Sequence, residues 1–174
     1  MDVYRVAFIG QGLLYNEAEL RRVLEAAISK IIREHDAVEF YVSHENHFDT
    51  LATSAVRMVE TSYSLQNSTV HLVLPHSVGK NDFFASYDGI LYCLPTESDA
   101  DRTMRNNHRI MIDQSDLVIG FVHEESGEAY QGINYAKSVE KPVRNLADEI
   151  SDAEEIFSQE NIEACRRRAK RTLR

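Results

Sequence analysis

The chain of 174 residues has only two cysteines and three prolines, and it has no tryptophan. Cys93 and Cys165 lie far apart, so they supply neither a disulfide framework nor a four-ligand zinc site. No apolar run approaches about 18 residues, the length that a membrane span needs. The first residues also lack the basic segment that opens a secretory signal. We therefore expect a cytoplasmic protein with no membrane partner.

Positive charge is scarce as well. The chain has 19 Lys and Arg against 28 Asp and Glu, a net charge of −9. Six of the cations fall in residues 166–174, so residues 1–165 carry 13 − 28 = −15 and the tail carries +6. An acidic body repels phosphate backbones, and no aromatic residue interleaves the basic run to stack on bases, so nucleic acid is not the expected partner. The tail suits either an acidic partner or the end of a helix, whose dipole favours cations.

Strand-like and helix-like segments alternate along the chain. Apolar runs typical of strands occur at 4–9, 37–42, 69–74, 117–122 and 143–146. Residues 90–94 fit either a short extra strand or an extended loop. The alternation predicts an α/β fold: a Rossmann-like, doubly wound, mostly parallel five-stranded sheet with helices on both faces. Residues 1–174 are expected to form one domain, in which residues 151–174 are a C-terminal helix and basic tail.

The clearest helix follows the first strand. Asn16 and Glu19 have the spacing of a capping box. The helix has one apolar face, formed by Leu20, Val23, Leu24, Ala27, Ile28, Ile31 and Ile32. Because ligands of such folds bind at the carboxyl ends of the strands, the loops 10–16, 43–49, 75–88 and 123–128 are the places to search for a site.

Gly10, Gln11 and Gly12 end the first strand. Two glycines let backbone approach a phosphate closely, but the same residues also suit a tight strand-to-helix turn. Tyr15 stands where the dinucleotide fingerprint has its third glycine. Ser43 stands where that motif has an acid after the second strand. A dinucleotide site of that type is therefore not expected.

Two later segments offer anion-binding groups. Arg105, His108 and Arg109 share part of a helix face; an arginine there can hold a phosphate or carboxylate, or can pair with a nearby aspartate on an exposed helix. Asn106 can bind a sugar hydroxyl or a base edge. Ser126 and Gly127 stand where a helix N-terminus would bind an anion. Three glutamates surround them, at positions 124, 125 and 128, and these can equally stabilise the helix dipole without a ligand.

Other catalytic or metal patterns are weak. His44 and His47, with nearby carboxylates and His123, match no specific zinc motif, so we assign no metal. No Ser-His-Asp or Cys-His arrangement is recognisable. Cys93 lies in an apolar stretch and is expected to be a core or edge residue.

Taken in order, these residues resemble the SLOG superfamily in its YpsA-like branch over about residues 4–147. The segment from Arg105 to Asp116 is the most specific part. Weaker matches are Gly10, Phe40-Tyr41-Val42, Phe48-Asp49, Ser126-Gly127 and Asn134-Tyr135-Ala136-Lys137. The resemblance implies a Rossmann-like sheet that binds nucleotides or nucleotide-derived ligands. In the related Lonely Guy phosphoribohydrolases, an Arg-Lys pair corresponds to Arg105-Asn106, and the catalytic glutamate corresponds to Gln131. An amide cannot act as a general acid or base, so that hydrolase activity is not expected.

The leading hypothesis is a binding module for a nucleotide or nucleotide-derived ligand. Arg105 would hold a phosphate, Asp49 would cap its helix or accept a ribose hydroxyl, and Tyr15 or Tyr130 would stack on a base. The predicted ligand-binding residues are Gly10, Gln11, Gly12, Ser43, Asp49, Arg105, Asn106, Ser126, Gly127 and Glu128. One alternative is a nucleoside monophosphate N-glycosidase that uses Glu125 or Glu128, and another is a protein-interaction module with a vestigial pocket. The sequence identifies neither a cofactor nor catalytic residues, and it is compatible with a homo-oligomer.

Overall fold

The computed structural model describes residues 2–43, 46–75, 85–93 and 100–150, without the side chains of residues 75, 93 and 100–106. The strands are β1 (Val3–Gly10), β2 (Ala37–Val42), β3 (Ser68–Pro75), β4 (Gly89–Cys93), β5 (Leu117–Phe121) and β6 (Val143–Asn145). The helices are α1 (Glu17–Glu34), α2 (His47–Tyr63), α3 (Ala100–Gln114) and α4 (Gly127–Ser138), with a 3-10 turn at Leu146–Asp148.

The sheet has six strands in the order β4-β3-β2-β1-β5-β6, and every neighbouring pair is parallel. The predicted Rossmann-like α/β fold is confirmed, with six strands instead of five because residues 89–93 form an edge strand beside β3. Strands β2, β3 and β4 follow one another on one side of β1, whereas β5 and β6 lie on its other side. The topological switch point therefore lies between β1 and β5, and a crevice is expected where these strands end.

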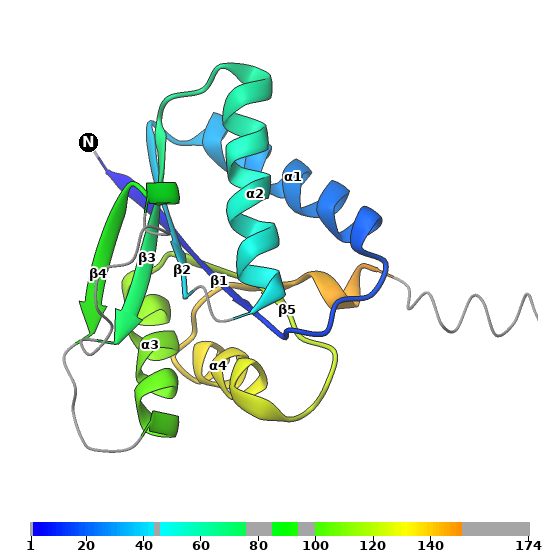
Figure 1. Cartoon of the computed structure of the whole chain (residues 1–174), viewed down its shortest axis with the longest axis vertical. Helices are drawn as coiled ribbons and strands as arrows, with labels where there is room; N and C mark the ends of the chain where they lie inside the picture. The colour runs from blue at the N-terminus through cyan, green and yellow to red at the C-terminus, as the bar shows by residue number, and fades with distance from the viewer. Residues whose placement is uncertain (1, 44–45, 76–84, 94–99, 151–174) are drawn as a thin grey trace, which may run out of the picture.

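Helices cover both faces of the sheet (Figure 1). Alternate β1 residues face opposite layers: Val6 and Phe8 pack with α1 and α2, whereas Ala7 and Ile9 pack with α3 and α4. This alternation follows from the two-residue period of a strand. The predicted apolar face of α1 is confirmed, with all but the half-buried Val23 inside the core. None of the helices among the described residues is long and apolar enough to span a membrane.

The predicted capping box at the start of α1 is wrong. Asn16 has left-handed backbone angles, with φ 44° and ψ 50°, and its side chain caps nothing. An N-cap side chain reaches the helix amides from an extended backbone, which Asn16 lacks. Glu19 instead holds Arg22 through two hydrogen bonds of 2.9 and 2.6 Å. The C-terminal helix and basic tail predicted at residues 151–174 lie outside the described residues.

Candidate functional site

Gln11 closes the switch-point crevice between β1 and β5. Its Nε2 donates to the carbonyl oxygens of Glu124 and Ser126 at 2.9 and 3.3 Å, and its Oε1 accepts from the backbone N–H of His123 and Glu124 at 2.9 and 3.0 Å. Backbone N–H groups after a strand commonly bind anions in such folds. Here two of them are already bonded to a side chain of the protein, so Gln11 joins the two loops at the predicted ligand edge.

Gly10 is required by packing. A Cβ at this position would overlap the ring of Phe48, which is fully buried in the layer of α2. The Gly10 carbonyl accepts a 2.9 Å hydrogen bond from the Asn46 amide. Gly12 is different, because a Cβ there would lie 3.5 Å from Asn46 Cβ, an ordinary contact. The lack of a side chain at Gly10 therefore lets the Phe48 ring pack against the backbone of β1. Gly12, in contrast, is exposed.

Ser43, just after β2, and Asp49, in the first turn of α2, bind one another. The Ser43 hydroxyl donates to Asp49 Oδ2 at 2.7 Å, and both side chains are buried. Asn46, with an extended backbone, is the N-cap of α2 and accepts from the Asp49 N–H at 3.2 Å. The structure therefore brings these two predicted site residues together as an internal pair at a helix N-terminus, where a carboxylate is stabilised by the helix dipole.

Contacts between α3 and α4 join the other two predicted segments. His108 lies against Gly132, where a Cβ would be 3.5 Å from the histidine Nδ1. Burial lowers the pKa of His108 to about 4, and a hydrogen bond to the backbone of Glu128 opposes the shift. Arg105 and Asn106 lie up to one turn earlier in α3. The structure describes their helical backbone but not their side chains. The first turn of α4 thus neighbours the turn of α3 that follows Arg105.

Arg109 does not pair with a carboxylate in the described part of the chain. Its guanidinium lies 4.9 Å from the centre of the Tyr135 ring, and the Tyr135 hydroxyl donates to Asp113 at 2.8 Å. Arg109 thus forms no ion pair with Asp113, the nearby aspartate on its own helix, because Tyr135 lies between the two side chains. Asp99 lies outside the described residues, and the side chain of Asp101 does too.

Asn107 is the residue that the sequence did not single out. Its side chain is fully buried, and neither its amide nitrogen nor its oxygen has a hydrogen-bond partner in the described structure. It lies one turn before the buried Met111, on the side of α3 that faces the sheet. Buried amides are nearly always paired, because an unpaired one costs about 1–3 kcal/mol. The burial of Asn107 depends on tertiary packing, so no sequence signal could have found it.

A cavity of about 360 Å³ lies beside the N-terminal part of α4, between the segment after β5 and the 3-10 turn. Its polar walls include Glu124, Glu125 and Asp148, with Lys137 opposing them. Ser126 is extended, makes no side-chain cap, and precedes Gly127, which has φ +83° and open space around it. Three carboxylates against one lysine make this cavity unfavourable for a polyphosphate.

The described residues contain no cluster of His, Cys, Asp and Glu that could hold a metal ion. His47 lies 3.7 Å from Glu17, and His123 contacts the Leu13 carbonyl oxygen at 2.9 Å. His44 and Glu45 lie outside the described residues. Tyr15, one of two residues predicted to stack on a base, packs against Phe121 and His123, with ring centres 5.0 Å apart in each case.

Comparison with known proteins rests on structure, since no protein-family model and no curated protein matches the chain. DNA processing protein A of Streptococcus pneumoniae has 14% identity and a TM-score of 0.60 over 81% of this chain. The chain spans about half of that protein, 49% of its length. DNA processing protein A of Helicobacter pylori, described with its single-stranded DNA binding mode, has 13% identity and a TM-score of 0.58 over 91% of this chain and 73% of its own.

The molybdenum cofactor carrier protein of Chlamydomonas reinhardtii has 15% identity and a TM-score of 0.51, over 82% of this chain and 75% of its own. These likenesses show the fold. They agree with the Rossmann-like architecture that the SLOG resemblance implies, while the YpsA-like branch stays a prediction.

Proposed function

We propose that the protein is a binding module for a nucleotide or nucleotide-derived ligand at the carboxyl edge of its sheet. The edge combines the switch point between β1 and β5 with the N-terminus of α4. Proteins that share the fold are described as binding single-stranded DNA or as carrying a molybdenum cofactor. A ligand-binding role for this fold is therefore well precedented, and the acidic body of this chain favours a small ligand over a nucleic acid.

The unpaired amide of Asn107 is the observation that carries the proposal. A carboxamide offers one acceptor and two donors, the pattern that pairs with the edge of a nucleobase. The burial of the Asn107 amide would be costly unless a hydrogen-bond partner satisfies it. We assign Arg105 to a phosphate, Asn106 to the sugar or base, and Asn107 to a polar group of the same ligand. Ser126, Gly127 and Glu128 supply backbone groups at the N-terminus of α4.

Charge limits the kind of ligand. Glu124, Glu125 and Asp148 line the cavity beside α4, so each additional phosphate placed near them is repelled. A single arginine, Arg105, offsets about one phosphate charge. The proposed ligand is therefore a nucleoside monophosphate or a related molecule of low charge, rather than a triphosphate.

The proposal excludes hydrolysis of the Lonely Guy type. Gln131 occupies the position of the catalytic glutamate in that family, and its side chain is exposed on α4. A glutamine neither donates a proton as an acid nor accepts one as a base at neutral pH. Release of free base from nucleoside monophosphates at high protein concentration would instead support the N-glycosidase alternative.

A thermal-shift panel tests the proposal. Nucleoside mono-, di- and triphosphates, cyclic nucleotides and a short single-stranded oligonucleotide are added separately to the full chain. A monophosphate present at about 100 times its Kd stabilises the folded state by about 2.7 kcal/mol, which raises the melting temperature by several degrees. The proposal predicts a larger shift for monophosphates than for triphosphates. A flat response to every small nucleotide contradicts it, and a response to the oligonucleotide alone assigns the edge to nucleic acid.

A further inference from the structure

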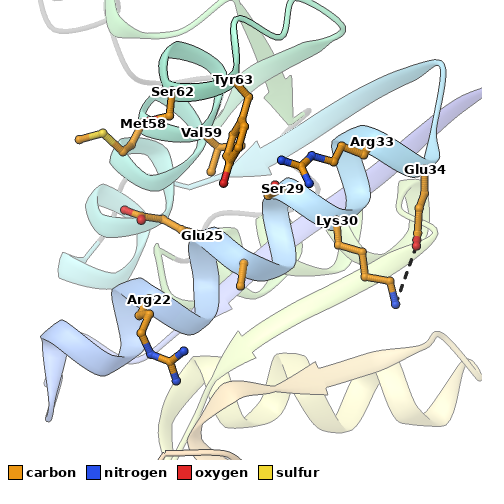
Figure 2. Close-up of a pocket in the computed structure, with 11 residues that line it drawn as sticks. Arg22, Glu25, Ser29, Lys30, Arg33, Glu34, Met58, Val59, Ser62 and Tyr63 are labelled. Atoms are coloured by element: carbon orange, nitrogen blue, oxygen red, sulfur yellow. Dashed lines mark ion pairs between the residues drawn. The ribbon is translucent and has the colours of Figure 1, made fainter.

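A second feature lies away from the carboxyl edge, where a groove of about 570 Å³ separates α1 from the end of α2 (Figure 2). Each of these helices leads directly into the next strand, so their C-terminal ends lie at the amino edge of the sheet. The side chains of Met58 and Tyr63 line the groove and are 51% and 52% exposed. The groove is thus partly apolar and remote from the proposed ligand site.

Two opposite charges on α1 point into this groove. Figure 2 shows the Glu25 and Arg33 side chains directed toward α2, whereas Lys30 pairs with Glu34 along α1 at 3.9 Å. The Arg33 guanidinium lies 4.3 Å from the centre of the Tyr63 ring, and no carboxylate in the described part of the chain pairs with it. Among the described residues, the one ion pair of Glu25 is a long contact of 3.8 Å to Arg21. Both charged groups can therefore take a further partner.

The spacing of these charges is self-complementary. Glu25 precedes Ser29 by four residues and Arg33 follows it by four, about one helical turn on each side. In an antiparallel crossing of two α1 helices over Ser29, Arg33 of each copy lies opposite Glu25 of the other. Ala26 is small and exposed beside this point, so it permits close approach of the second helix. If a two-fold axis relates the two copies, the Arg33–Glu25 contact occurs twice in the dimer.

We propose that this groove is a docking surface for a second copy of the chain, paired through reciprocal Arg33–Glu25 contacts over an apolar floor of Met58 and Tyr63. Charge complementarity favours a second copy as the occupant. The whole chain has a net charge of −9, yet the groove is lined by Arg22, Lys30 and Arg33 against only Glu25 and Glu34. Two acidic molecules meet with least repulsion where each is locally least acidic. The proposed ligand edges remain open in such a dimer.

Sedimentation analysis of the full chain at micromolar concentrations tests the dimer. The wild-type chain is expected to sediment as a dimer, whereas Glu25→Arg and Arg33→Glu each raise the dissociation constant by at least about 10-fold, because each turns two attractions into two repulsions. Mixing the two variants restores a dimer. The arginine introduced at position 25 of one variant then faces the glutamate introduced at position 33 of the other, while the unchanged Arg33 and Glu25 face each other.

Lys137→Glu is the matched control, since Lys137 is likewise a cation in the last turn of a helix, on the opposite layer. It leaves the dimer unchanged. Ala26→Arg, which blocks the crossing sterically, gives a monomer without reversing either charge and provides a second variant. A monomeric wild-type chain, or a dimer that both charge reversals leave intact, overturns the proposal. Melting curves of each variant confirm that a loss of dimer is not a loss of folding.

Discussion

Gln11 and Glu124 are bonded to one another in both directions, although 113 residues separate them in the chain. The amide nitrogen of Gln11 donates to the Glu124 carbonyl oxygen at 2.9 Å, and Gln11 Oε1 accepts from the Glu124 N–H at 3.0 Å. The contact joins the ends of β1 and β5 at the switch point. It explains why a glutamine, with both a donor and an acceptor, stands between the two glycines.

Gln11→Glu is expected to lower the free energy of unfolding by about 1–3 kcal/mol. The carboxylate keeps an acceptor for the backbone N–H groups, but its second oxygen lies against the carbonyl oxygens of Glu124 and Ser126. Urea denaturation at pH 7 measures the change. Gln114→Glu at the exposed end of α3 is the control and is expected to change stability by less than about 0.5 kcal/mol. If both variants lower the free energy of unfolding equally, the hydrogen bonds of Gln11 between the two loops do not stabilise the fold.

Gly10→Ala is expected to destabilise the fold by about 1–3 kcal/mol, because the new methyl group overlaps the buried ring of Phe48. Gly12→Ala is the matched control and leaves stability nearly unchanged, since its Cβ meets only an ordinary contact. Thermal unfolding of the two variants compares them directly. If both glycines tolerate alanine equally, packing is not the reason for Gly10.

His108 makes the fold sensitive to mild acid. Its pKa is lowered to about 4 by burial, whereas the unfolded chain has an ordinary value of about 6.5. Between these values the unfolded state binds more protons, so stability is lost as the pH falls through this window. We expect a loss of about 2 kcal/mol between pH 7 and pH 5 from this residue alone. Urea denaturation at the two pH values measures it.

The variant His108→Gln removes the titrating group from the same position. Its stability should change less than that of the wild-type chain between pH 7 and pH 5, even if it is less stable at both. An unchanged difference between the two pH values would show that the acid sensitivity arises elsewhere.

The variant Asn107→Leu tests whether the Asn107 amide binds the ligand or has only a structural role. Leucine has a similar size and no polar atoms, so the substitution removes two unpaired buried groups and is expected to raise the melting temperature. If the amide serves the ligand, the same variant loses binding of the nucleotide found in the panel. Higher stability with intact binding would remove Asn107 from the proposed site.

Local patterns predicted much of the fold. The apolar face of α1 and the alternation of strands and helices depend on neighbouring residues, which the sequence displays directly. The two caps illustrate where this fails. Asn16 with Glu19 and Asn46 with Asp49 have the same spacing, but only Asn46 has the extended backbone that a cap requires. That difference comes from the tertiary path of each loop.

The site was harder to predict than the fold because its groups interact over long distances in sequence. The partners of Gln11 lie 112 to 115 residues away, so its bridging role has no local pattern. Ser43 and Asp49 were predicted as ligand groups, and their shared burial depends on tertiary packing. The burial of Asn107 depends on how α3 packs against the sheet, which a helix in isolation does not determine.

The most direct test of the central claim is calorimetric titration of a nucleoside monophosphate into three proteins: the wild-type chain, Arg105→Ala and Arg109→Ala. The two arginines lie one turn apart on α3, and Arg109 is already stacked over Tyr135. We expect Arg105→Ala to weaken binding by at least about 10-fold, the effect of losing a charge-assisted contact to phosphate. Arg109→Ala should bind like the wild-type chain. Equal affinity of all three proteins, or loss of binding in Arg109→Ala alone, would contradict the proposed site.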